Sequence, residues 1–424
     1  MTTTTTLSVP AGNWAGNVVY AASAVHLPES LDELCGLVAG SPRIRAAGTG
    51  HSFSRIADTA GGELVRLDGL PAEVTIDTAA ATAIVAAGMR YAEVSAALQD
   101  VGWALANLAS LPHISVAGSC ATGTHGSGDG QRCLAAAVTG LERVSADGTV
   151  SWTRRGAYGF DGSVVALGAL GIVTRLALEI EPAFEARQLV RLDVPLIEVA
   201  ESFDEVFGAA YSVSVFTDWR SGTASVWLKQ RVDRAPGRWS GGRAAEVQLH
   251  PVPDTPAGFS TLQLGVPGPW HERLPHFRPE FVPGAGEELQ SEYYLPRAAA
   301  PAAIAAVREL GDLVASVSHI SEIRTVRGDS LWLSPAYGRD SVTLHFTWIH
   351  DEAAVRPVIA AVEERLRPLG ARPHWGKLTA MSADELAACH ERAGDFARLV
   401  AERDPEGKFG NDFLDAFLTA ARRP

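Results

Sequence analysis

Arg45-Ala-Ala-Gly-Thr-Gly-His-Ser-Phe53 joins a short apolar strand to a Gly-Thr-Gly turn that is followed directly by a histidine. Because glycines keep side chains out of the way, such a turn can bring backbone N–H groups close to an anionic or ring-shaped ligand. His51 would then project toward whatever those N–H groups hold. We therefore predict a ligand-binding turn at residues 48–51.

Helices and short strands surround this turn. Ser30 and Glu33 form a capping box for one helix, and apolar residues at helical spacing mark another within 94–101. Strands this close together leave no room for repeated helical crossovers, which favours an α+β domain over a doubly wound sheet. The strands are expected at 43–47, 63–67, 74–77, 83–86, 136–143 and 176–180.

Small and hydroxylated residues dominate the stretch 107–128, which has glycines at positions 118, 123, 126 and 128. Such a stretch offers many backbone N–H and hydroxyl donors, which suits a pyrophosphate and an extended cofactor. Its spacing is neither GxGxxG nor that of a Walker loop, so an ordinary Rossmann or P-loop site is not supported. A plain surface loop is the alternative, and the glycine turn before His51 favours the ligand site.

The pattern changes near residue 185, where strand-rich sequence begins. Strands are expected at 189–194, 212–219 and 224–230, and the Pro- and Gly-rich interval 251–283 is typical of loops or an edge. We therefore place a domain boundary there.

Three later segments carry polar or charged residues that could bind a ligand or take part in catalysis. Alternation along a strand puts Glu322 and Arg324 on one face, and puts His345 and Thr347 opposite the apolar residues 342, 344, 346 and 348. Lys377 follows a glycine. Each also has a non-functional interpretation. Glu322 and Arg324 could form a structural ion pair, and His345 and Lys377 could simply be solvated.

Helices close the chain. They are expected over 301–313 and 355–366, and a third begins at the capping box of Ser382 and Glu385 and runs through Cys389 to Leu399. The tail is similar in composition to the first region, so the chain is expected to return to it. The predicted division is 1–185, 186–378 and 379–424.

Composition narrows the possible partners. The net charge of −13 disfavours nucleic acid and an anionic membrane surface, and no apolar run approaches the ~20 residues of a spanning helix. The histidines show neither HxH nor HExxH spacing, so no metal site is expected. The amino-terminal threonine run lacks the basic and apolar parts of a secretory signal, and we expect its first residues to be disordered. The four cysteines are scattered, so we expect reduced thiols in a cytoplasmic protein. We also expect a monomer.

The order of several motifs along the whole chain resembles the vanillyl-alcohol-oxidase-type flavoproteins, and within them most closely the bacterial alditol oxidases. The resemblance implies two α+β subdomains that bind FAD and a substrate cap on an antiparallel sheet, with the carboxyl-terminal segment rejoining the FAD domain. The motifs are Gly48-Thr-Gly-His-Ser-Phe53, Ser110-Leu-Pro-His-Ile-Ser-Val-Ala-Gly118, Ala121-Thr-Gly-Thr-His-Gly126, Gly168-Ala-Leu-Gly-Ile-Val-Thr174, Glu322-Ile-Arg324, His374-Trp-Gly-Lys377 and Asp404-Pro-Glu-Gly-Lys-Phe409.

FAD is the cofactor that this resemblance implies, joined covalently through His51 to the 8α-methyl carbon of the flavin. A covalent link keeps the flavin in place and raises its potential for hydride uptake. The other cofactor contacts implied are Gly48, Thr49, Gly50, Ser52, Phe53, Ser110, Ser115, Gly118, Ser119, Cys120, Ala121, Thr122, His125, Gly126, Val173 and His374.

The activity implied is oxidation of the terminal alcohol of a polyol such as xylitol or sorbitol, with hydride transfer to flavin N5 and oxygen reduced to hydrogen peroxide. Because the hydroxyl proton must leave with the hydride, the site needs a base and a cation. We assign these roles to His345 and Lys377. The remaining hydroxyls would bind Glu322, Arg324, Ser110 and Thr347.

Two other functions stay open from the sequence. An aldonolactone oxidase or dehydrogenase shares the Glu-x-Arg and His-Trp-Gly-Lys elements at Glu322 and His374. A polyol- or nucleotide-binding module without catalysis would retain the fold but not need His345 and Lys377.

Overall fold

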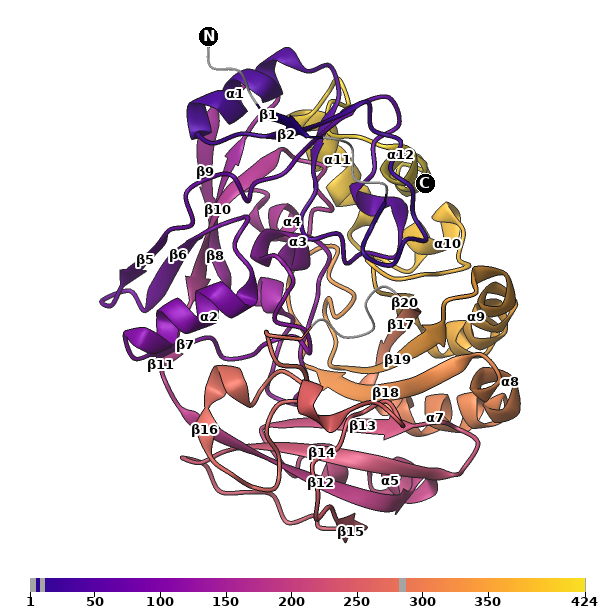
Figure 1. Ribbon diagram of the computed structural model, residues 1–424. Coiled ribbons are helices and arrows are strands. Elements are labelled where there is room, and N and C mark those ends of the chain that lie inside the picture. The colour runs from indigo at the N-terminus through magenta and orange to yellow at the C-terminus, as the bar shows by residue number, and fades with distance from the viewer. Residues whose placement is uncertain (1–4, 8–11, 282–286, 424) are drawn as a thin grey trace.

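The computed structural model describes residues 5–7, 12–281 and 287–423. Figure 1 shows the amino-terminal elements and the last helices in the upper half of the molecule, above a large sheet. Within the described residues, no helix is long and apolar enough to cross a membrane. Most of the threonine run, for which disorder is expected, lies outside them, but Thr5 and Thr6 are paired in a strand, so for these two residues the expectation is wrong.

A four-stranded sheet carries the Gly-Thr-Gly turn. It consists of β1 (Thr5–Leu7), β2 (Ala24–Leu27), β3 (Ile44–Ala46) and β4 (Glu63–Val65), with α1 (Leu31–Gly40) between β2 and β3. The order is β1-β2-β4-β3, and β2 and β3 both run parallel to β4. Ser30 accepts a hydrogen bond from the Glu33 N–H, so the predicted helix start is confirmed. The chain leaves β3 directly into the turn.

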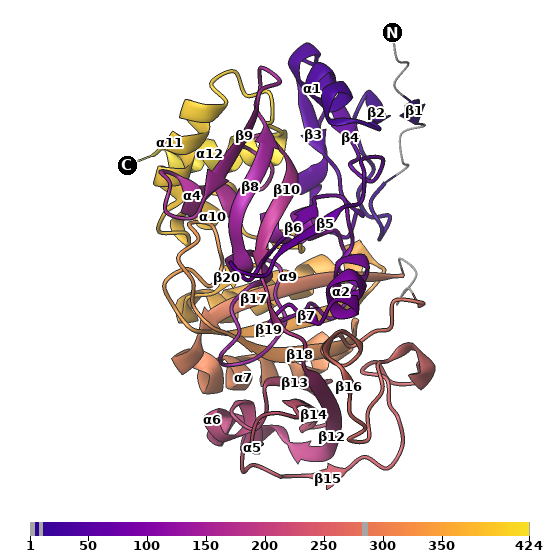
Figure 2. The same ribbon diagram turned by 90° about the vertical axis from the view of Figure 1, so that its left-hand side faces the viewer.

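An antiparallel five-stranded sheet forms the second part of the upper half (Figure 2). Its order is β5-β6-β10-β8-β9, with bounds β5 (Val74–Asp77), β6 (Thr82–Ala86), β8 (Val138–Val144), β9 (Val150–Arg154) and β10 (Ile172–Glu179). The predicted strands are confirmed, except that the chain before Val138 forms a 3-10 turn. The helices here are α2 (Tyr91–Asp100), α3 (Val116–Ala121) and α4 (Phe160–Val164), and β7 (Trp103–Ala104) pairs with β11 (Glu181–Pro182).

A nine-stranded antiparallel sheet fills the lower half, as the alternating pattern predicts. Its path is β15-β12-β14-β13-β18-β19-β17-β20, and β16 pairs with β12. The interval between β14 and β17 is mostly loop, which fits its proline and glycine content. The bounds are β12 (Glu185–Pro195), β13 (Ser212–Thr217), β14 (Thr223–Arg231), β15 (Arg243–Ala244), β16 (Gly268–Pro269), β17 (Glu288–Pro296), β18 (Ser318–Val326), β19 (Ser341–Ile349) and β20 (Arg372–Pro373).

Helices cover one face of this sheet. They are α5 (Leu196–Glu201), α6 (Phe203–Phe207), α7 (Ala300–Arg308), α8 (Gly311–Ala315) and α9 (Glu352–Leu366). Leu344, Phe346 and Trp348 of β19 pack beneath these helices, and burying each such side chain stabilises the fold by about 1.5–3 kcal/mol. Because strand side chains alternate, His345 and Thr347 must lie on the opposite face. The single helix expected over 301–313 is divided into α7 and α8.

Three helices at the carboxyl terminus pack against the core of the first region. They are α10 (Ala383–Ala388), α11 (Ala393–Arg403) and α12 (Asp412–Ala421). The prediction of one helix through Leu399 is wrong, because His390 Nδ1 donates to the Leu386 carbonyl and the ring packs 4.5 Å from Trp375. This packing supports a return to the first region, while the exact division into 1–185, 186–378 and 379–424 stays a prediction.

Candidate active site

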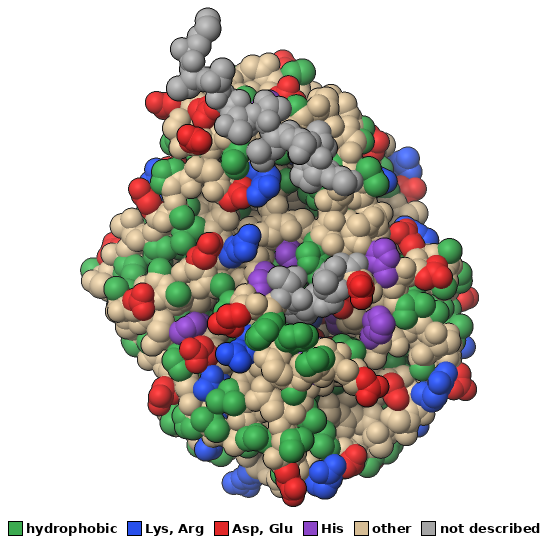
Figure 3. Space-filling view, viewed as in Figure 1, with side chains coloured by type: hydrophobic (Ala, Val, Ile, Leu, Met, Phe, Trp, Pro, Cys, Tyr) green, Lys and Arg blue, Asp and Glu red, His purple; other side chains and the backbone are tan. Residues whose placement is uncertain are grey.

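A cavity of about 970 Å³ lies between the glycine turn and the uncovered face of the nine-stranded sheet. This volume is near the upper end of the range for small-molecule and cofactor sites. Every residue predicted for the site lines the cavity except Gly126. Figure 3 shows histidine side chains gathered near the middle of the molecular surface that faces the viewer. The structure therefore brings together segments more than three hundred residues apart in the sequence.

Gly126 lies beside the cavity and does not line it. A Cβ at this position would stand 2.3 Å from the Leu108 carbonyl oxygen and 2.4 Å from the side-chain oxygen of Asn107. The glycine thus permits close packing of two loops. The direct cofactor contact predicted for Gly126 is not supported.

The glycine turn and the start of α3 meet at the side chain of Ser115. A Cβ on Gly48 would lie 2.4 Å from Ser115 Oγ, and one on Gly118 would lie 2.8 Å from the same oxygen. Gly50 has φ +74°, a conformation that side chains rarely adopt. The backbone of Gly50 therefore favours glycine, and a Cβ on Gly48 or Gly118 would require Ser115 to move. The three glycines leave an open backbone cradle on the cavity wall.

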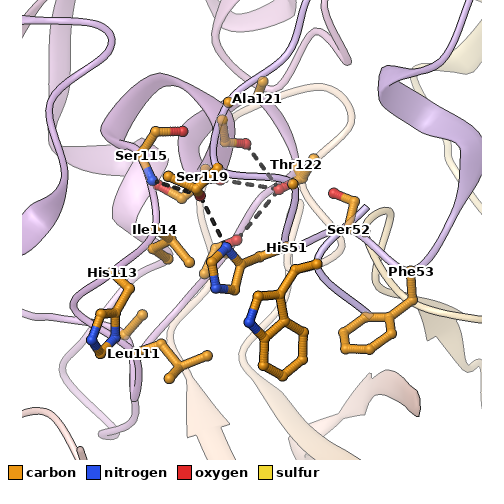
Figure 4. A pocket seen from close by; sticks show the side chains of 18 of the residues that line it. His51, Ser52, Phe53, Leu111, His113, Ile114, Ser115, Ser119, Ala121 and Thr122 are labelled. Carbon is orange, nitrogen blue, oxygen red and sulfur yellow. Dashed lines mark hydrogen bonds between the residues drawn. The ribbon is translucent and has the colours of Figure 1, made fainter. Parts of the chain in front are cut away.

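His51 projects from this cradle into the cavity (Figure 4). Its Nδ1 lies 3.0 Å from Thr49 Oγ1, and its ring stacks on Trp14 with centroids 5.3 Å apart. Asn13 donates to the Ser52 carbonyl and so fixes the turn from the same side. Burial, followed by the nearby His113 and Lys377, lowers the pKa of His51 to about 4. The imidazole is therefore neutral at pH 7, with a lone pair on one nitrogen.

The other predicted cofactor residues surround this part of the cavity. The side chain of Cys120 is buried, and burial raises its pKa to about 12, so the thiol packs against its neighbours and does not act as a nucleophile. The hydroxyl of Thr122 donates to the Gly118 carbonyl. Those that line the cavity are Gly48, Thr49, Gly50, Ser52, Phe53, Ser110, Ser115, Gly118, Ser119, Cys120, Ala121, Thr122, His125, Val173 and His374.

The opposite wall is formed by β18, β19 and β17. The strand register places Glu322 opposite His345, and His345 opposite Glu292. Arg324 donates from Nη2 to Glu292 Oε1 at 2.6 Å, and its Nε lies 3.5 Å from Glu322 Oε2. The Glu322 and Arg324 side chains therefore form the ion pair that the non-functional interpretation predicts, and both also line the cavity.

His345 is a buried neutral imidazole. Its Nε2 lies 3.3 Å from Thr347 Oγ1, and its Nδ1 lies 3.4 Å from Glu292 Oε2. Burial, and then the positive charge of Lys377, lowers the pKa of His345 below its ordinary value. A neutral imidazole can accept a proton, which fits the role predicted for it.

Lys377 supplies a cation on the same wall. Its Nζ donates to Gln290 Oε1 and lies 5.4 Å from the ring centre of Phe53, so it connects the sheet with the glycine turn. Burial lowers the pKa of Lys377 to about 8, and Glu292 opposes that shift. His374 beside it accepts a hydrogen bond from the Gly376 N–H and is neutral, because burial lowers its pKa well below the usual value.

The sequence interpretation missed three residues that contact the predicted ones. Glu292 contacts Arg324 and His345, Gln290 accepts from Lys377, and His276 Nε2 lies 2.9 Å from Glu322 Oε1. Gln290 and Glu292 alternate along β17, and this spacing of polar residues could have indicated a second polar strand face. Within the described residues, no cluster of three or more His, Cys, Asp or Glu could hold a metal ion.

Two protein families and several known oxidases and dehydrogenases are similar to this chain in sequence. Residues 22–154 match a family described as an FAD binding domain, and residues 287–417 match a family described as D-arabinono-1,4-lactone oxidase. An alditol oxidase from a Streptomyces species is 52% identical over 97% of this chain and 100% of its own length. An L-gulono-1,4-lactone dehydrogenase from Mycobacterium tuberculosis is 27% identical over 96% of this chain and 98% of its own.

Solved structures show the same fold at low sequence identity. The crystal structure of cholesterol oxidase from B. sterolicum superimposes with a TM-score of 0.80 at 15% identity. The match covers 98% of this chain and 97% of that one. At this identity the similarity concerns the fold alone.

Proposed function

The chain belongs to the alditol oxidase family of FAD-dependent flavoproteins, and on that basis we propose that it oxidises the terminal primary alcohol of an alditol to the aldose. Xylitol and sorbitol are the proposed substrates, with oxygen as the electron acceptor. The observation that carries the proposal is the meeting of a neutral base, His345, and a cation, Lys377, in the cavity that also receives His51.

The residues around the glycine turn suit FAD. The glycines leave a backbone cradle that a Cβ would fill, and two buried polar atoms on the cavity wall, Arg45 Nε and His113 Nδ1, have no hydrogen-bond partner among the described residues. A bound polar ligand would satisfy such groups. When bound, FAD accepts a hydride from the alcohol and passes the electrons to oxygen, giving hydrogen peroxide.

The roles of the sheet residues follow from their chemistry. His345 accepts the proton of the reacting hydroxyl, and Lys377 stabilises the negative charge that develops on its oxygen. Glu322, Arg324 and Thr347 bind the other hydroxyls of the polyol, together with Ser110 from the opposite wall. A short alcohol leaves these buried groups unpaired, so it is expected to react poorly.

Hydrogen peroxide production tests the choice of substrate. With FAD-loaded protein, turnover on xylitol and sorbitol is expected to exceed turnover on L-gulono-1,4-lactone. Faster turnover on the lactone than on either polyol would favour the second candidate, an aldonolactone oxidase or dehydrogenase, which the family match over residues 287–417 and the mycobacterial relative support.

We further propose that His51 holds the flavin covalently, because it is neutral and stands at the cradle. After acid precipitation, the protein is expected to stay yellow, and the flavin-bearing peptide is expected to contain His51. Replacing His51 with alanine should leave a flavin that acid releases, together with slower turnover. Release of all flavin from the unmodified protein would contradict the attachment.

His113 offers a control for this experiment. It lines the same cavity, and its Nε2 is hydrogen-bonded to the Pro279 carbonyl. The variant His113→Gln is expected to keep the flavin attached after acid treatment. Loss of attachment in both variants would show that the effect is general to the cavity wall and not specific to His51.

A cytoplasmic location and a monomeric state are proposed on other grounds. All four cysteines are free thiols, which suits a reducing compartment, and the net charge of −13 favours solubility as separate molecules. Cell fractionation and light scattering would test the two proposals separately.

A further inference from the structure

We propose that Glu292 is a positioning residue that fixes the tautomer of His345 and thereby presents the proton-accepting nitrogen to the cavity. The inference rests on the proposed function, in which His345 accepts the substrate proton. Glu292 lies in none of the sequence motifs that indicate the site. It is 1% exposed at the middle of β17.

The two oxygens of Glu292 have different neighbours. Oε1 accepts from Arg324 Nη2 at 2.6 Å and lies 2.8 Å from His125 Nε2. Oε2 lies 3.4 Å from His345 Nδ1, a contact outside hydrogen-bond geometry, and this buried Nδ1 has no other hydrogen-bond partner among the described residues. Because Arg324 and His125 occupy Oε1, Oε2 is the oxygen available to the His345 imidazole.

Glu292 is an anion in this setting. Burial would raise its pKa, but Arg324 and His125 outweigh burial and hold the pKa of Glu292 well below the usual value. A carboxylate only accepts hydrogen bonds, so it favours the tautomer with the proton on His345 Nδ1. The lone pair then resides on Nε2, which lies 3.3 Å from the Thr347 hydroxyl.

Several other charged or titratable groups surround the pair. Burial, and then Lys377 and Arg324, lower the pKa of His345, whereas Glu292 raises it. Removing the negative charge of Glu292 therefore lowers the pKa of His345. Since a base works when deprotonated, the acid limb of the rate profile should then move to lower pH. The groups that face the pair are Glu322 and Arg324 from β18, Tyr294 from β17, His125 from the glycine-rich stretch, and His374 and Lys377 from the segment after β20.

Glutamine in place of Glu292 tests the proposal at nearly constant shape. Its oxygen can still accept from Arg324, but its amide then turns an N–H toward His345 Nδ1 and favours the opposite tautomer. We expect anaerobic flavin reduction by xylitol to slow by roughly 10²- to 10⁴-fold, the range seen when a catalytic imidazole loses its orienting carboxylate. The acid limb should move to lower pH. The variant Glu292→Asp keeps the charge and should retain the wild-type tautomer, with a smaller loss of rate.

The matched control is Glu363→Gln. Glu363 of α9 is also a buried carboxylate, and it accepts a hydrogen bond at 3.0 Å from the hydroxyl of Tyr293. Tyr293 follows Glu292 in β17 and lies on the opposite face of that strand. This variant is expected to leave the acid limb in place. An equal shift in both variants would mean that the limb follows general destabilisation, and it would overturn the proposal.

A direct measurement of the tautomer separates this inference from the proposed function. In ¹⁵N-histidine-labelled holoenzyme, with the signal assigned by its loss in His345→Gln, the proton of His345 should be on Nδ1. A proton on Nε2 in the wild type, or an unchanged tautomer in a folded Glu292→Gln protein, overturns the role of Glu292. The measurement holds even if polyols fail to reduce the flavin, an outcome that would contradict only the proposed function.

Discussion

Replacing His345 with glutamine is expected to lower the rate of anaerobic flavin reduction by xylitol about 10²- to 10⁴-fold, the usual contribution of a general base. This loss corresponds to about 3–5 kcal/mol of transition-state stabilisation. Glutamine can still make a hydrogen bond to Thr347, but it cannot take up the hydroxyl proton at neutral pH. FAD content should stay unchanged, because the cradle around Gly48 lies on the opposite wall. Stopped-flow absorbance of the flavin measures the rate.

His350 provides the control for this variant. It follows β19 directly, does not line the cavity, and its Nε2 donates to the Ala15 carbonyl. The variant His350→Gln is expected to reduce flavin at close to the wild-type rate. A loss of less than about threefold in His345→Gln would contradict the assignment of His345 as the proton acceptor, since general-base contributions are larger.

Replacing Lys377 with methionine is expected to lower the same rate about 10²- to 10³-fold, as loss of one group that stabilises developing negative charge typically does. Methionine keeps the apolar stem and removes the cation. The wild-type rate should also fall as the pH rises through about 8, because burial lowers the pKa of Lys377 to that value and the cation is lost above it. The alkaline limb should be absent from the variant.

Lys408 distinguishes loss of this cation from loss of any buried lysine. Its Nζ donates to the Val38 and Ala146 carbonyls, away from the cavity. The variant Lys408→Met is expected to lower the melting temperature while keeping the alkaline limb. A Lys377→Met protein that retains the limb would contradict the role of Lys377.

Local patterns predicted much of the fold because their physical causes are local. The capping boxes at Ser30 and Ser382 marked two helix starts, and the alternation along β19 correctly separated His345 and Thr347 from the apolar face. The glycines around His51 predicted a backbone cradle for the same reason. A glycine lacks the Cβ that would otherwise fill the space beside Ser115.

Features that depend on contacts between distant segments could not be predicted from local sequence patterns. Glu292 enters the site because β17 pairs with β19 in one particular register, and no local pattern fixes that pairing. α10 ends at Ala388, and just after it the ring of His390 donates to the Leu386 carbonyl and packs on Trp375 from a distant segment. Gly126 lies in a Gly- and Ser-rich stretch that is typical of a cofactor loop. In the fold it packs against Asn107 and Leu108, beside the cavity and not on its wall.

The visible spectrum of the FAD-loaded protein, recorded before and after anaerobic addition of sorbitol, shows whether a polyol reduces the flavin. If the chain is a polyol oxidase, the oxidised flavin bands should bleach, and they should return with formation of hydrogen peroxide when oxygen is admitted. A spectrum that stays oxidised with both sorbitol and xylitol would contradict this activity.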